Sequence, residues 1–212
     1  MNWFKKRSPG FDPDRFRYLH HAAITYGDED GGMVRFSQNL PAAVNILDAA
    51  ATHYYDPQRD ILIKVPLTFD QRTELRWLHM AFLLWLAGEL LMQATPHRDK
   101  GMLMWDELCH LTVGATPLEF KPLKAFLDAP VRYSKMEPFS ARVWHFGKEY
   151  SRIVTGSEND IAMVAASQVR LPTIIGILSP VLRKVLTTRR GEIAWVNEFA
   201  DGLRRLHAGA GK

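Results

Sequence analysis

The stretch WLHMAFLLWLAGELLM, residues 77–92, constrains the fold more than any other part of the sequence. His79 and Glu89 are the two polar side chains within this otherwise apolar run. A helix that is apolar on every face is buried, either in a protein core or in a bilayer. Spanning a bilayer takes about 20 apolar residues, whereas this run has sixteen and carries a carboxylate. We therefore interpret it as the central core helix and expect no stable membrane insertion.

The boundaries of this helix are marked by two local signals. TFDQ at 68–71 has the spacing of a capping box, in which Thr68 and Gln71 each bond the other's backbone N–H. Thr95-Pro96 marks the other end, because the residue before a proline disfavours helical geometry. These signals predict one long helix over about 69–94.

Proline, glycine and turn residues divide the rest of the chain into shorter helical patterns. Asn39 is predicted to cap one of them, with Pro41 just inside its start. In the last one, an apolar stripe is expected to dock on the core: Ile193, Val196, Phe199, Leu203 and Leu206. The predicted shorter helices cover about 14–26, 39–55, 102–112, 117–128, 137–154, 158–169, 173–188 and 192–207.

No internal repeat, low-complexity tract or linker interrupts this pattern. We therefore predict an all-α fold, a mostly helical bundle of about eight or nine helices in a single domain over residues 1–212. Two segments leave room for minor β structure. Residues 24–26 and 33–36 flank the turn GDEDGG and could pair as a hairpin, and 61–67 could form an edge strand.

Glu89 lies on the inward stripe of the long helix, so its carboxylate needs a partner. One interpretation is structural: an ion pair, or a hydrogen bond from a Tyr, Trp or His, with Arg142, His110 and His145 as candidate partners. The alternative is a helical-bundle metalloenzyme, because Glu107 and His110 form a Glu-x-x-His pair on one helical face. The candidate ligands of such a site are Glu89, Glu107, His110, His145 and Glu149.

The number of Glu-x-x-His pairs argues against the metalloenzyme alternative. Di-metal bundles of this kind use two such pairs on different helices, and this chain has one. The single cysteine, Cys109, is predicted to be a small core residue, and no phosphate loop, dinucleotide fingerprint or Gly-x-Ser-x-Gly occurs. We therefore predict no catalytic residues and no cofactor, without excluding catalysis.

The net charge of +4 resides in the C-terminal quarter, at about 160–212. The last 52 residues of the chain hold eight basic against three acidic side chains. The run at 171–190 loosely resembles a helix-turn-helix with Gly176 in the turn, but Pro172 would break its first helix. Cations concentrated in this way indicate an anionic partner. The candidate nucleic-acid-binding residues are Arg170, Arg183, Lys184, Arg189, Arg190, Arg204 and Arg205.

The leading hypothesis is a non-catalytic helical subunit of a larger cytoplasmic assembly, which contacts DNA or RNA through these C-terminal helices and also binds other protein subunits. The lone cysteine, which cannot form an internal disulfide, fits the reducing cytoplasm that this hypothesis assumes. A protein–protein or membrane-peripheral adaptor is a further alternative, in which the same cations meet an acidic protein or lipid headgroups.

Overall fold

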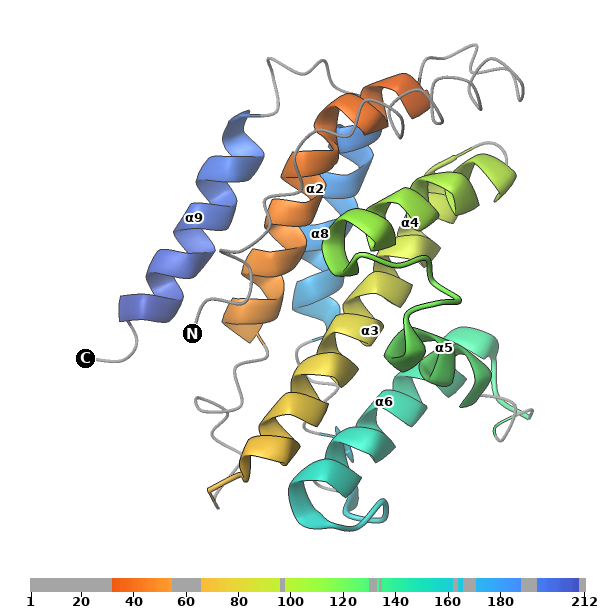
Figure 1. The fold of residues 1–212 in the computed structure, drawn as a ribbon, viewed down its shortest axis with the longest axis vertical. Helices are drawn as coiled ribbons and strands as arrows, with labels where there is room; N and C mark the ends of the chain where they lie inside the picture. The colour runs from red at the N-terminus through yellow and green to blue at the C-terminus, as the bar shows by residue number, and fades with distance from the viewer. Residues whose placement is uncertain are drawn as a thin grey trace.

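Seven helices make up the described part of the protein (Figure 1). The structure, a computed structural model, describes residues 32–54, 66–95, 98–129, 133, 135–161, 164–165, 171–187 and 194–209. No strand occurs in these ranges, so the predicted all-α class is confirmed, while the predicted count of eight or nine helices is not. The helices are α2 (Gly32–Tyr54), α3 (Phe69–Ala94), α4 (Arg98–Val113), α5 (Lys121–Asp128), α6 (Pro138–Thr155), α8 (Leu171–Thr187) and α9 (Ala194–Gly209).

Helix α3 has the predicted boundaries and lies at the centre of the fold. Its capping box is formed: the Thr68 backbone N–H donates to Gln71 Oε1 at 2.9 Å, and the Gln71 N–H donates to Thr68 Oγ1 at 3.2 Å. The Gln71 side chain also donates to the Ile153 carbonyl at 2.8 Å, which ties the start of α3 to the end of α6. Helices α4, α5, α6, α8 and α2 all pack against α3.

Aromatic side chains fill the space between α3, α5 and α6. The rings of Phe82 and Phe146 stack with their centroids 4.3 Å apart. Trp85 packs against Phe126 at 5.7 Å, and Phe126 also meets Phe82 edge to face at 6.1 Å. Offset-stacked and edge-to-face contacts of this kind add to the stability that comes from burying the ring area.

Helices α3 and α4 approach each other closely at glycines. A Cβ added to Gly88 would lie 2.6 Å from Trp105 Cε2, and one added to Gly101 would lie 2.8 Å from Met92 Cα. The Trp105 indole N–H donates to the Leu84 carbonyl at 2.7 Å, which holds the ring over Gly88. The absence of a side chain at these positions therefore sets the spacing of the two helices.

Helix α2 forms a second part of the fold, with α8 and α9 packed along it. It begins at Gly32, seven residues before the predicted start, so Asn39 is not an N-cap but a buried residue inside the helix. Pro41 also lies within α2, with its ring exposed to solvent. The predicted hairpin is wrong because residues 33–36 are helical, and its other half, 24–26, lies outside the described residues.

The remaining predicted elements have mixed outcomes. The four patterns at 102–112, 117–128, 137–154 and 173–188 correspond to α4, α5, α6 and α8, although α4 begins earlier and α5 is shorter than predicted. The last pattern, 192–207, corresponds to α9. The predicted helix at 14–26, half of the residues of 158–169 and the strand residues 61–65 lie outside the described residues, and residues 66–68 are neither helix nor strand.

In the described ranges, α3 alone is long and apolar enough to cross a membrane by length and composition. Of its most apolar 18-residue window, 67% is buried against other helices. The core helix of a bundle passes the same test, so the composition of α3 is explained by its packing.

Candidate nucleic-acid interface

Two of the predicted nucleic-acid-binding side chains are exposed on α8. This helix buries Ile174, Leu178 and Val181, which follow one stripe against the rest of the fold. Arg183 and Lys184 fall off the stripe near its C-terminal end and are exposed. Cations in the last turn of a helix are also favoured by the helix dipole, which is a stabilising role that does not require a partner.

No helix-turn-helix exists here, because α8 continues without a turn through Gly176. Pro172 lies in the first turn of α8, where proline is tolerated, and Pro180 lies inside the helix with its ring exposed. The expectation that Pro172 breaks a helix is therefore wrong, since the helix begins at the residue before it.

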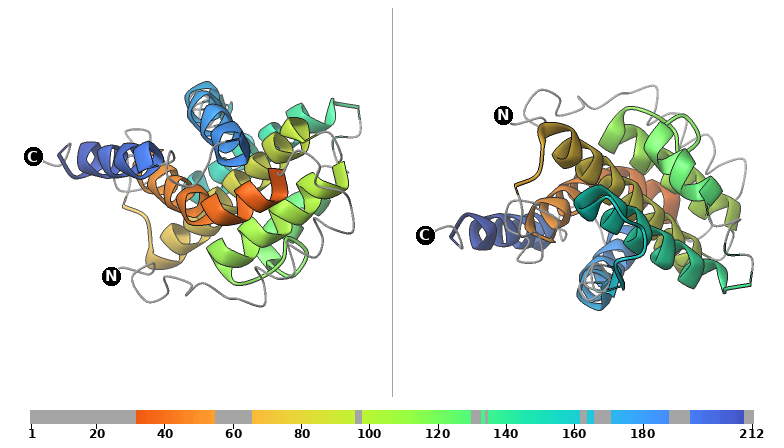
Figure 2. Two further views of the ribbon diagram at one scale, coloured as in Figure 1. Left: turned by 90° about the horizontal axis from the view of Figure 1, so that it is seen from above. Right: turned by 90° about the horizontal axis from the view of Figure 1, so that it is seen from below.

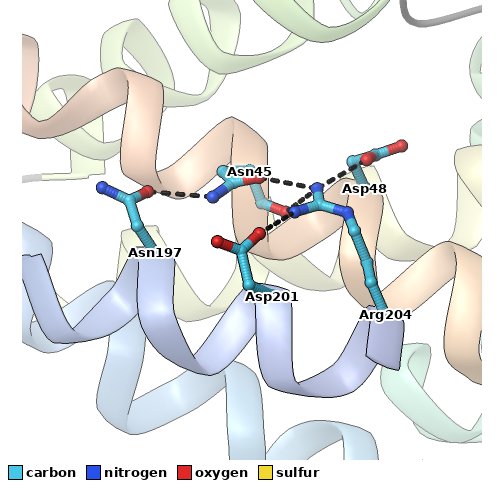
Figure 3. Close-up of polar contacts among 5 residues, drawn as sticks. All are labelled: Asn45, Asp48, Asn197, Asp201 and Arg204. Atoms are coloured by element: carbon cyan, nitrogen blue, oxygen red, sulfur yellow. Dashed lines mark hydrogen bonds and ion pairs between the residues drawn. The ribbon is translucent and has the colours of Figure 1, made fainter. Parts of the chain in front are cut away.

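Arg204 has several partners within the protein (Figure 3). Its guanidinium group donates to Asp48 Oδ2 at 2.7 Å, to Asn45 Oδ1 at 2.6 Å and to Asp201 Oδ1 at 3.1 Å. The Asn45 amide in turn donates to Asn197 Oδ1 at 2.9 Å. This network, which we call the Arg204 cluster, joins α9 to α2, so Arg204 has a structural role, and its contact with nucleic acid stays a prediction.

Arg205, the next residue, is exposed at the surface of α9. The predicted apolar stripe of α9 is confirmed in part, since Val196 and Leu203 are buried. Phe199 was predicted to dock with them, but it is 39% exposed, as is Trp195 one turn earlier. Ala200, which the sequence pattern did not select, fills the buried position instead.

Three other predicted cations, Arg170, Arg189 and Arg190, lie outside the described residues. Two of them follow α8 directly in the sequence. Of the seven candidates, the structure therefore places Arg183, Lys184 and Arg205 at the surface and Arg204 in an internal ion pair.

Glu89 has the structural partners that one sequence interpretation predicts. The Trp85 indole N–H donates to Glu89 Oε1 at 3.2 Å. The charge of Glu89 also acts on Arg142, although no ion pair joins these two described residues, and the Arg142 guanidinium donates to the carbonyls of Phe126 and Leu127 at the end of α5. Burial lowers the pKa of the Arg142 guanidinium, and the charges of Glu89 and Asp128 oppose that shift. The carboxylate thus compensates a half-buried cation at the junction of α3, α5 and α6.

The five candidate metal ligands are not assembled into a site. Glu149 instead pairs with Arg152 at 2.9 Å, while Glu107 and His145 are buried on α4 and α6. Among the residues that the structure describes, no three His, Cys, Asp or Glu side chains come together in a way that could hold a metal ion. His110, in the last turn of α4, therefore belongs to no described group of three such side chains.

Cys109 is fully buried on α4, as predicted for a small core residue. Burial raises the pKa of its thiol, and the nearby carboxylate of Asp106 raises it further. A thiol in these surroundings stays protonated and is a poor nucleophile.

The sequence analysis missed Asn45 and Asp48, the α2 partners of Arg204. Their signal was present, since NILDAAA places an acid in a helical segment rich in apolar residues, the same pattern that singled out Glu89. Which cation would meet Asp48 was not predictable, because Arg204 lies 156 positions away along the chain.

Comparison with known proteins gives no relative for this arrangement. No family model, no curated protein and no solved structure matches the chain.

Proposed function

We propose that the protein is a non-catalytic helical subunit of a larger cytoplasmic assembly, and that it contacts DNA or RNA through the C-terminal end of α8. The observation that carries the proposal is the exposure of Arg183 and Lys184 at that end. Buried Cys109, the single cysteine, is consistent with a reducing compartment.

The sequence around α8 supports an anionic partner. Residues 161–191 contain no Asp or Glu, so the positive charge in this segment has no acid next to it in sequence. Lys and Arg that approach phosphates release condensed counterions, which yields affinity without reading base sequence. Arg183 and Lys184 are adjacent near the C-terminal end of α8, and contact of these two cations with the phosphate backbone is the mode that we propose.

The test is fluorescence anisotropy with single- and double-stranded DNA and RNA over a salt series. The variant R183Q/K184Q removes two exposed cations from α8, and R72Q/R76Q removes two exposed arginines from α3 as a matched control. Because each lost phosphate contact removes about 0.9 from the logarithmic salt slope, we expect R183Q/K184Q to reduce the slope by about 2. Binding at low salt should weaken about tenfold.

Two results would reject the nucleic-acid proposal. One is the absence of binding by the wild-type chain at low salt, and the other is an equal loss for the α3 control, which would indicate attraction by net charge alone. Flotation with anionic vesicles, run alongside, separates a membrane-peripheral adaptor from a nucleic-acid-binding subunit, since only the adaptor would float through Arg183 and Lys184.

A further inference from the structure

Helix α9 lies at the edge of the molecule and packs extensively on α2 alone. Both views in Figure 2 show it projecting from the bundle beside α2, away from α4, α5 and α6. Its contact side consists of buried Val196, Ala200 and Leu203, together with the Arg204 cluster. The opposite side of α9 is therefore not covered by any described helix of the chain.

This uncovered side has a defined composition, which we call the α9 outer face. At 100° per residue, four described side chains fall on it or at its border, those of Trp195, Glu198, Phe199 and Arg205, together with Gly202. Trp195 and Phe199 are each 39% exposed, and Glu198 and Arg205 are also exposed. Aromatic residues and arginine are enriched in protein–protein interfaces relative to the rest of the surface.

The charges of the α9 outer face are complementary to themselves. Glu198 lies four residues before Gly202 and Arg205 three residues after it. Within the part of the chain that the structure describes, neither Glu198 nor Arg205 makes an ion pair. If two α9 helices cross antiparallel near Gly202, each Glu198 comes opposite Arg205 of the partner subunit, so one surface supplies both halves of two ion pairs.

We propose that a second copy of this chain docks on the α9 outer face, with α9 antiparallel to α9 about a two-fold axis near Gly202. Gly202 brings no side chain to the crossing point; apart from the tip of Arg205, a Cβ there would meet nothing within 4 Å. The backbones can therefore approach closely, and the aromatic rings are covered on both sides of the axis.

The size of the interface sets the expected affinity. A single pair of four-turn helices buries less area than a standard stable interface, so the dimer belongs to the weak class. We expect a dissociation constant of roughly 10–100 µM, which corresponds to a reversible association. Dimerisation does not depend on the proposed nucleic-acid contact, because Arg183 and Lys184 lie on α8.

The test is sedimentation velocity of the full chain without nucleic acid, from about 5 to about 300 µM, a range that brackets the expected constant. Wild type should shift from monomer to dimer across this range. The reversals E198R and R205E should each weaken dimerisation at least tenfold, since each places like charges opposite one another. The double variant E198R/R205E should restore it, because the two charges are then exchanged rather than lost.

The apolar part is tested by W195S/F199S, which should abolish the dimer, against L118S as a control at an exposed apolar residue far from α9 in sequence. All these side chains are exposed, so circular dichroism should show an unchanged fold. A wild-type chain that stays monomeric throughout, or a double reversal that fails to rescue, would overturn the proposal.

The outcomes also separate this inference from the proposed function. If R183Q/K184Q loses nucleic acid but still dimerises, the two surfaces are independent, as proposed. If the chain is monomeric and W195S/F199S instead loses single-stranded nucleic acid, the α9 outer face is a stacking platform for bases. The dimer is then rejected, while the contact through α8 is decided separately by R183Q/K184Q.

Discussion

At the scale of single residues, Glu89 shows how one carboxylate fits an apolar helix. It accepts a hydrogen bond from Trp85 and compensates Arg142, whose other donors hold the last carbonyls of α5. Its role is thus to let three helices meet around a half-buried cation. An acid in an apolar helix of this kind need not mark a chemical site, because it can accept a hydrogen bond within the fold and offset the charge of a nearby half-buried cation.

This role predicts the effect of E89Q. Glutamine keeps an acceptor for the Trp85 indole but removes the charge that compensates Arg142, so we expect a loss of about 1 kcal/mol in the free energy of unfolding. E89L, which also removes the acceptor, should lose about 2 kcal/mol or more. Urea denaturation measures both, with E137Q at an exposed glutamate on the start of α6 as the control. Equal stabilities of E89L and wild type would show that the carboxylate has no structural role.

At the scale of helices, local capping signals predicted boundaries well where the end is determined locally. The capping box at Thr68 and Gln71 placed the start of α3 at the correct residue. Proline was misleading: Pro41 was taken to mark a helix start and Pro172 to break a helix, yet Pro41 lies inside α2 and Pro172 lies in the first turn of α8. Propensity treats an interior proline as a break of about 3 kcal/mol, but packing of α2 and α8 against each other outweighs that cost.

What the sequence could not predict is contact between distant helices. Periodicity identified Val196 and Leu203 as buried, but it also selected Phe199, which is exposed. The width of the buried stripe depends on how many helices pack against α9, and periodicity does not give that number. Among the described helices, α9 packs extensively only on α2, and this leaves a narrow buried stripe. Likewise, the sequence pattern predicts Arg204 as a surface cation, because it gives no sign that Asp48 on α2 pairs with it.

The close approach of α3 and α4 yields a prediction at the same scale. G88A adds a methyl group that would lie 2.6 Å from a ring held in place by its hydrogen bond to Leu84, so the helices must separate. We expect a loss of about 2–3 kcal/mol in unfolding free energy, as for overpacked cores. G176A on α8 meets nothing within 4 Å, and it should gain about 0.5–1 kcal/mol from helix propensity alone.

The comparison between the two alanine variants isolates the steric effect, because both replace a helical glycine by the same residue. Thermal or urea melts of G88A, G176A and wild type give the result directly. A G88A variant as stable as G176A would mean that Trp105 can move aside, and that Gly88 does not set the spacing between the helices.

At the scale of the whole molecule, the fold has a core of α3 to α6 and a second part in which α2 holds α8 and α9. Helix α9 is attached by three small or aliphatic side chains and by the Arg204 cluster. The side chain of Asp48 in this pair is 18% exposed and that of Arg204 is 32% exposed. An interface this polar is expected to open more readily than the aromatic core around Phe82.

This attachment predicts that R204A loosens α9 without unfolding the core. Removing the guanidinium leaves the half-buried carboxylate of Asp48 unpaired, and its Oδ1 already has no hydrogen-bond partner among the described residues. We expect the opening free energy of α9 to fall by about 2 kcal/mol, which is roughly 30-fold faster amide hydrogen exchange across the helix. Exchange in α3 should stay unchanged, because the core does not depend on this pair.

R205A is the matched control, since it removes the same side chain from the neighbouring, exposed position of the same helix. Measured at a protein concentration low enough to keep the chain monomeric, it should change the exchange rates of α9 by less than about twofold. Equal effects of R204A and R205A would show that α9 is held by its apolar stripe alone. A selective effect of R204A would instead make the Arg204 cluster the contact that keeps the α9 outer face turned away from the rest of the molecule and available to a second copy.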